Sequence, residues 1–209
     1  MTDAATLTHD GLGPDGPGQV LVIACGAIAR EIIALRDRNG WNHIALTCLP
    51  AILHNHPEKI TGAVRDAVAK HRAGYDRIFG ADADCGTGGQ LQSACADLGV
   101  EMIAGPHCYS FFEGHATFAA RAEDEITAFY VTDFLVRQFD AFVIEPLGLD
   151  RHPQLRDMYF GHYEKLVYQA QTTDAALLEK ARACADSLGL SFEHRFTGYG
   201  DLETALARL

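Results

Sequence analysis

Three of the six cysteines stand where a thiol could do chemistry. Cys25, Cys85 and Cys108 each lie in a loop that follows a short apolar run, and His107 comes directly before Cys108. Short apolar runs that alternate with segments of helical periodicity predict buried parallel strands. Ligands bind outside the carboxyl ends of such strands. We therefore expect the three cysteines to meet at the carboxyl edge of one sheet.

Metal binding is the first chemistry that this set of residues supports. Thiolates suit zinc or an iron–sulfur cluster. Three protein ligands leave one zinc position open for a substrate. The expected ligands are Cys25, Cys85 and Cys108, with His107 as a fourth. His54 and His56 follow the second apolar run and could also reach the same edge.

Thiolate catalysis without a metal is the second possibility. Each of the three cysteines precedes or opens a predicted helix, and the partial positive charge of a helix N-terminus lowers a thiol pKa. Two facing cysteines could take a proton from a small carboxylate and return it, as in amino-acid racemases of the aspartate/glutamate type. This is an analogy of arrangement, since the local motifs of those enzymes are absent. Both possibilities make Cys25, Cys85 and Cys108 the candidate catalytic residues.

A glycine-rich segment, residues 85–89, carries a separate prediction. Glycines between a strand and a helix expose backbone N–H groups to an anion, although the segment matches neither the Walker loop nor the GxGxxG fingerprint. The alternative is a tight turn. Asp82 and Asp84 flank the segment, and one of them could be a general base. The residues expected to bind a small anionic ligand are Gly86, Thr87, Gly88, Gly89 and Tyr109.

The other cysteines are expected in the core. Cys95 and Cys184 fall inside amphipathic helices, and Cys48 ends a strand. Free cysteine is among the most buried residue types.

The elements that position these residues are predicted from apolar periodicity. Strands are expected at residues 19–24, 43–48, 75–80, 100–104, 165–170 and 190–196. Helices are expected at residues 28–38, 58–72, 87–98, 108–120, 124–139, 173–188 and 201–209. Alternating strands and helices predict the α/β class, with a Rossmann-like, doubly wound and mostly parallel sheet flanked by helices.

Length and charge limit the functions. The chain has 209 residues and a net charge of -11, which is unlike the basic face of a nucleic-acid-binding protein. No apolar run reaches the roughly 20 residues that cross a bilayer. Residues 1–18 are polar, so we expect a flexible tail there, and a single domain over residues 19–209. Without a secretory signal, the expected location is the cytoplasm, where cysteines stay reduced.

The residues discussed above resemble a bacterial and archaeal family that is known as a domain of unknown function. The matching segments are residues 24–27, 53–55, 84–89, 105–109, 132–135, 147–153 and 197–200. Members of that family are often encoded beside corrinoid-dependent methyltransferases. The resemblance implies a role near methyl transfer, either as an enzyme or as an accessory protein that binds methyltransferase components.

The segment around His152 and Tyr159 is dense in polar and aromatic side chains. It could form a lid or a contact between subunits, so a homo-oligomer is possible. Helix capping by Asp150 is the alternative.

Overall fold

The computed structural model describes residues 3–15 and 18–209 and divides them into two compact units. Unit 1 is formed by Met1–Phe111 with Asp201–Leu209, and unit 2 by Phe112–Gly200. The predicted α/β class with parallel strands flanked by helices is confirmed, but the strands form two sheets where one was expected. Periodicity identifies strands without telling which of them pair, and here each sheet carries its own apolar core.

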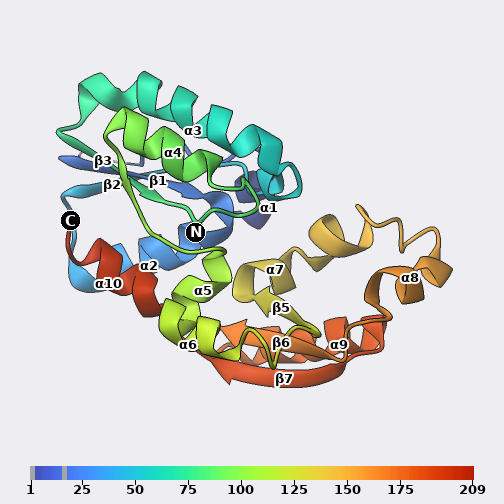
Figure 1. Ribbon diagram of the computed structural model, residues 1–209. Coiled ribbons are helices and arrows are strands. Elements are labelled where there is room, and N and C mark those ends of the chain that lie inside the picture. The colour runs from blue at the N-terminus through green and yellow to red at the C-terminus, as the bar shows by residue number, and fades with distance from the viewer. Residues whose placement is uncertain (1–2, 16–17) are drawn as a thin grey trace. The chain divides into compact units, whose positions relative to one another are not determined.

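The sheet of unit 1 has the strand order β2-β1-β3-β4, and all of its strands are parallel (Figure 1). The strands are β1 (Val20–Cys25), β2 (Ile44–Leu49), β3 (Arg77–Ala81) and β4 (Glu101–Met102). The chain leaves β1 toward β2 on one side and continues to β3 on the other. The carboxyl ends of β1 and β3 therefore flank the point where the strand order reverses, which is where such sheets bind ligands.

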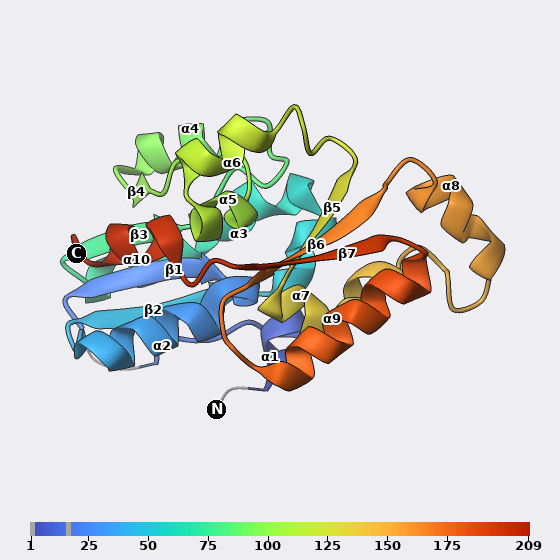
Figure 2. The same ribbon diagram turned by 90° about the horizontal axis from the view of Figure 1, so that it is seen from below.

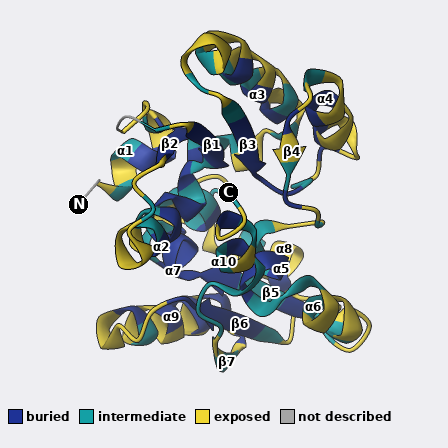
Figure 3. Ribbon diagram, turned by 90° about the vertical axis from the view of Figure 1, so that its left-hand side faces the viewer, coloured by how far each residue is buried: buried dark blue, intermediate teal, exposed yellow. Residues whose placement is uncertain are grey.

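Helices cover both faces of this sheet. Figures 1 and 3 place α3 (Pro57–His71) and α4 (Gln90–Leu98) on one face, and α2 (Ala29–Asn39) and α10 (Gly200–Leu206) on the other. Apolar residues of β1, α3 and α4 form the core between them, among them Ile23, Val64 and Leu91. This unit is therefore doubly wound, as expected.

The segment expected to be a flexible tail is folded where the structure describes it. Asp3 caps helix α1 (Ala4–His9), and the Leu7 side chain is fully buried. Leu12 forms an antiparallel bridge with Cys48. A Cβ at Gly26 would lie 2.3 Å from the Leu7 carbonyl oxygen, so α1 packs where only glycine leaves room. Residues 1, 2, 16 and 17 lie outside the described residues.

The sheet of unit 2 is parallel, with the order β5-β6-β7. Its strands are β5 (Ala128–Thr132), β6 (Lys165–Ala170) and β7 (Ser191–Phe196), and α9 (Ala175–Leu188) runs along β6 and β7 (Figure 2). The predicted helix at residues 124–139 is wrong over β5, whose aromatic and β-branched residues suit a strand. Only α7 (Asp133–Arg137) and a π-turn follow as helix.

Shorter elements complete the two units. The helix expected at residues 108–120 is broken at Gly114, where φ is +86°. The remaining helices are α5 (Cys108–Glu113), α6 (His115–Arg121) and α8 (Arg156–Phe160). The 3₁₀ and π turns are η1 (Gly26–Ile28), η2 (Ala51–Asn55), η3 (Arg72–Gly74), η4 (Asp140–Ile144) and η5 (Pro153–Leu155). In the part of the chain that the structure describes, no helix has the length and apolar character that a membrane span requires.

Candidate functional site: a cysteine pocket in unit 1

Two backbone hydrogen bonds join the loop after β3 to the loop after β4. The Asp84 N–H donates to the Gly105 carbonyl at 3.0 Å, and the Cys85 N–H donates to the Pro106 carbonyl at 3.0 Å. Because these loops are held together, the Cys85 Sγ lies 3.6 Å from the Cys108 Sγ. Two thiols that are separated in sequence are thus in direct contact.

Cys85 has an unusual backbone conformation. Its φ is +46°, and among the described residues it is the one non-glycine residue with a positive φ. The left-handed region is unfavourable for a residue with a Cβ. Strain of this kind costs on the order of 1–3 kcal/mol and clusters at functional sites. The surrounding hydrogen bonds therefore hold this thiol in a position that the chain would not otherwise adopt.

A pocket lies at the reversal point of the unit 1 sheet. Its polar groups are the side chains of Cys25, His54, Asp82 and Cys85, and His54 is solvent-exposed. The rest of the lining is mostly apolar, namely Leu49, Pro50, Leu53, Ile60 and Ala83. Cys25 ends β1, and the loop with Asp82 and Cys85 follows β3, so the strand ends deliver these groups as expected.

Cys85 and Cys108 have thiol pKa values that are shifted in opposite directions. The hydrogen bond from Cys108 lowers the pKa of Cys85 most, and a hydrogen bond from His54 lowers it further, against the opposing effect of burial. The same contact raises the pKa of Cys108, and burial adds to that rise. The Cys85 anion raises the pKa of His54. At neutral pH Cys85 is therefore the thiolate, and Cys108 keeps its proton.

Asp82 and Cys25 hold their protons in the same pocket. Burial, with a smaller contribution from the Cys85 charge, raises the pKa of the Asp82 carboxyl to about 8. Burial, followed by the neighbouring Asp82, raises the pKa of the Cys25 thiol well above its ordinary value. The Cys25 Sγ also accepts a hydrogen bond from the Ala27 N–H at 3.4 Å. The pocket thus places one thiolate beside a neutral carboxylic acid and a neutral thiol.

The glycine-rich loop does not present the free amides that anion binding requires. Asp84 accepts hydrogen bonds from the Thr87 hydroxyl at 2.7 Å, from the Gly88 N–H at 3.1 Å and from the Gly89 N–H at 2.6 Å. These bonds, with the one from Thr87 first, lower the pKa of Asp84. Anion binding at Gly86, Thr87, Gly88 and Gly89 stays a prediction. The bonds to Asp84 favour its alternative, a tight turn closed by a carboxylate of the chain itself.

The imidazole at the thiolate comes from His54 and not from His107. His107 is exposed, and its ring lies 6.4 Å from the ring of Tyr109, centroid to centroid. Burial raises the pKa of Tyr109 well above its ordinary value, with smaller contributions from the cysteines. In the sequence, His54 could have been identified by its place after β2, which pairs with β1. His107 was expected at the site because it directly precedes Cys108.

The metal site expected from the sequence stays a prediction. Within residues 3–15 and 18–209, no group of three or more His, Cys, Asp and Glu side chains has a geometry that could hold a metal ion. Cys85 and Cys108 are in contact. Cys48, Cys95 and Cys184 are buried, as expected of core residues.

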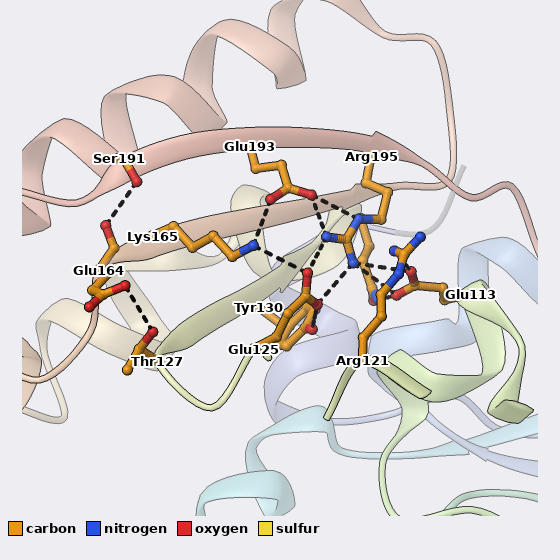
Figure 4. Close-up of polar contacts among 11 residues, drawn as sticks. Glu113, Arg121, Glu125, Thr127, Tyr130, Glu164, Lys165, Ser191, Glu193 and Arg195 are labelled. Carbon is orange, nitrogen blue, oxygen red and sulfur yellow. Dashed lines mark hydrogen bonds and ion pairs between the residues drawn. The ribbon is translucent and has the colours of Figure 1, made fainter. Parts of the chain in front are cut away.

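A second group of polar side chains lies in unit 2 and was not predicted. We call it the charged network (Figure 4), and it consists of Glu113, Arg121, Glu125, Lys165, Glu193 and Arg195. Arg195 pairs with Glu113 at 3.1 Å and with Glu125 at 2.7 Å, and Lys165 pairs with Glu125 at 3.2 Å and with Glu193 at 2.8 Å. Arg195 also pairs with Glu193, and Arg121 pairs with Glu113.

Strand alternation could have identified part of the charged network. Lys165 and Gln169 on β6, and Glu193 and Arg195 on β7, occur at alternate positions, which places them on one face of the sheet. The Gln169 amide donates to Glu113 at 2.9 Å. The hydrogen bond from Arg195 contributes most to lowering the pKa of Glu125, to about 2. Each of the three carboxylates of the network, Glu113, Glu125 and Glu193, therefore pairs with at least one cationic side chain.

The fold and the pocket define a class of protein: an α/β protein with a cysteine thiolate at the reversal point of a parallel sheet. The chain belongs to the family described as "Protein of unknown function (DUF1638)", whose model matches residues 48–206. The match includes His54, Cys85 and Cys108 and leaves out Cys25. The family description names no activity, so the link with corrinoid-dependent methyl transfer stays a prediction.

Comparison with other proteins adds little. No curated protein matches the chain. A solved structure with a weak likeness is the ornithine carbamoyltransferase from Pyrococcus furiosus, with 13% identity and a TM-score of 0.24. The match covers 86% of this chain and 54% of that one, so the chain spans about half of the other protein. A TM-score this low carries no argument about function.

Proposed function

We propose that unit 1 is the catalytic unit of a cysteine-dependent enzyme in which Cys85 is the nucleophile. The observation that carries the proposal is the contact of Cys85 with Cys108, at 3.6 Å between sulfurs, beside a pocket that Cys85 itself lines. A thiolate is the reactive form of cysteine, and catalytic thiolates occur in such partly exposed, hydrogen-bonded positions.

Each polar group of the pocket has a role in the proposed reaction. The Cys85 sulfur gives an electron pair to an electrophilic carbon of the substrate and forms an S–C bond. The electron pair of the broken bond goes to the leaving atom, which takes the proton of Asp82. His54 and Cys108 stabilise the resting thiolate by donating hydrogen bonds to it. Proton transfer by a group whose pKa lies near the working pH is efficient.

The lining of the pocket indicates a class of substrate. Five of the nine residues that line the pocket are Leu, Ile, Pro or Ala. In the neighbouring glycine loop, the backbone N–H groups of Gly88 and Gly89 already donate hydrogen bonds to Asp84. The imidazole of His54 already faces the thiolate. We therefore propose a small, weakly polar substrate in place of the anionic ligand that the glycine loop suggested.

Alkylation tests the proposal directly. Reduced, chelator-treated protein is labelled with iodoacetamide at pH 6, and each cysteine is followed by peptide mass spectrometry. Cys85 is expected to react at least about tenfold faster than Cys95, because at this pH a typical thiol is almost entirely protonated. Cys85→Ser removes the fast phase, and Cys184→Ala, a buried cysteine of unit 2, is the matched control that keeps it. Equal rates at Cys85 and Cys95 would contradict the proposal.

A metal held by the same thiols is the second candidate, and one observation favours it. Two thiolates on one tetrahedral zinc lie about 3.8 Å apart, since each Zn–S bond is about 2.3 Å. The Cys85 and Cys108 sulfurs lie 3.6 Å apart. Cys25 or His54 would have to move to complete the ligand set.

Metal analysis of protein purified without air separates the two candidates. Near-stoichiometric zinc or iron that is lost in both Cys85→Ser and Cys108→Ser supports the metal site. It also predicts slow alkylation of Cys85 until the metal is removed, because a coordinated thiolate is not free to react. Metal-free protein with a fast Cys85 rules out this second candidate.

A further inference from the structure

The Cys85–Cys108 pair has a property that nucleophilic catalysis by Cys85 alone does not use. Among the described cysteines it is the one pair whose sulfurs lie within hydrogen-bonding distance, at 3.6 Å. A disulfide needs about 2.05 Å between sulfurs. Cys85 lies in the loop after β3, and Cys108 begins α5 after the loop that follows β4. The hydrogen bond from the Cys85 N–H to the Pro106 carbonyl keeps these two loops side by side. The pair is therefore close to bonding distance before any oxidant arrives.

The two thiols differ in their access to the pocket. Cys85 lines the pocket, whereas Cys108 is not part of its lining. A molecule that enters the pocket therefore meets Cys85 and reaches Cys108 through its contact with Cys85. This order is what thiol–disulfide exchange requires of an attacking and a resolving cysteine.

We propose that Cys85 and Cys108 form a redox-active dithiol that reduces small disulfides, with Cys85 as the attacking thiol and Cys108 as the resolving thiol. The proposal rests on the proposed function, because it uses the same Cys85 nucleophile and names a substrate class for it. A disulfide with small or apolar substituents also suits the mostly apolar lining of the pocket.

The reaction balances in two steps. The Cys85 thiolate attacks one sulfur of the substrate disulfide, an S–S bond forms between them, and the other half leaves as a thiolate. That thiolate takes the proton of Cys108. The Cys108 sulfur then attacks Cys85, which forms the Cys85–Cys108 disulfide and releases the second half as a thiolate. The substrate gains two electrons, the protein dithiol loses two, and an external thiol returns the protein to its reduced form.

Oxidised glutathione and the small, uncharged reagent bis(2-hydroxyethyl) disulfide serve as probes. Reduced, metal-free protein is incubated with each probe without air, quenched with acid, and mapped by mass spectrometry. The wild type is expected to give a peptide pair joined through Cys85 and Cys108, with little mixed disulfide. Cys108→Ser is expected to accumulate the mixed disulfide at Cys85, at least about tenfold above wild type, because the resolving thiol is missing. Cys184→Ala is the control that behaves like wild type.

Each outcome bears on the proposal. A wild type that keeps the mixed disulfide at Cys85 overturns it, because Cys108 then does not resolve the intermediate. Fast alkylation of Cys85 by iodoacetamide without reaction with either disulfide overturns the dithiol and leaves the proposed function standing. A Cys85 that reacts with neither class of reagent overturns both. If Cys108→Ser fails to fold, as judged by circular dichroism, Cys108→Ala replaces it.

Discussion

The cysteine pocket of unit 1 and the charged network of unit 2 are both buried groups of ionisable side chains. They differ in how the buried charge is compensated. In the network, Glu113 and Glu125 are almost fully buried, and each accepts an ion pair from Arg195. In the pocket, burial keeps Asp82 protonated beside the Cys85 thiolate. Mutual pairing lowers carboxyl pKa values and favours stability, whereas opposed shifts in one pocket prepare an acid and a nucleophile.

Two consequences distinguish the regions experimentally. Changes in the network should alter the free energy of unfolding and leave Cys85 reactivity unchanged. Changes in the pocket should alter reactivity, and removing its buried carboxyl should even stabilise the protein.

Arg195→Met should have the largest effect. It leaves Glu113 and Glu125 buried with Arg121 and Lys165 as their remaining cationic partners, and breaking a buried ion pair costs about 3–5 kcal/mol. The free energy of unfolding, measured in urea at pH 7, should fall by that order. Arg182→Met is the matched control, since Arg182 is half-exposed in its pair with Glu179, and it should cost less than about 1 kcal/mol. Equal losses in the two variants would contradict a stabilising role for the network.

Asp82→Asn should stabilise the protein at alkaline pH. The folded-state pKa of about 8 lies above the ordinary value of 3.8, so the contribution of Asp82 to stability is most favourable at acid pH and is lost as the pH rises from about 4 to 8. Asparagine does not ionise, and the gain in unfolding free energy should be about 2–4 kcal/mol at pH 8 and smaller at pH 5. Urea unfolding at both pH values measures it. A loss of stability at pH 8 would mean that the pKa of Asp82 is not raised in the folded protein.

Glu125→Gln should act with the opposite sign. Its folded-state pKa of about 2 lies below the ordinary value of 4.5, so Glu125 contributes stability above pH 4.5 that is lost as the pH falls toward 2. The variant should lose about 1–3 kcal/mol at pH 7 and show a weaker acid dependence. The same urea series measures it. A variant as stable as wild type at pH 7 would remove the contrast with Asp82.

His54→Asn should have the smallest effect on stability and a visible one on reactivity. His54 is exposed, and it helps to hold Cys85 as the thiolate. The variant should raise the pKa of Cys85 and shift the pH profile of its alkylation rate upward by about one pH unit, which slows alkylation about tenfold on the acid side of the profile and corresponds to about 1.4 kcal/mol. His107→Asn is the control expected to alkylate like wild type. If the control slows the reaction instead, the imidazole at the site is the one that the sequence first suggested.

Sequence periodicity predicted most of the fold because apolar runs and helix ends are local properties. The helices predicted at residues 28–38 and 87–98 end at Gly40 and Gly99, which adopt the left-handed conformation that glycine favours at a helix end. The missed strand β5 and the folded N-terminal helix depend on partners distant in the chain. The division into two sheets also depends on distant partners, because the sequence of one strand does not determine which strand it pairs with.

For the site, the sequence by itself determined that Cys25, Cys85 and Cys108 follow strands, and parallel strands send their carboxyl ends to one edge. The tertiary structure alone decided that Cys85 and Cys108 touch, that His54 supplies the imidazole, and that Asp84 takes the amides of the glycine loop. These outcomes rest on hydrogen bonds between loops and on burial, which depend on the three-dimensional packing of distant residues. The types and order of the reactive residues are local information, while their contacts and protonation states are not.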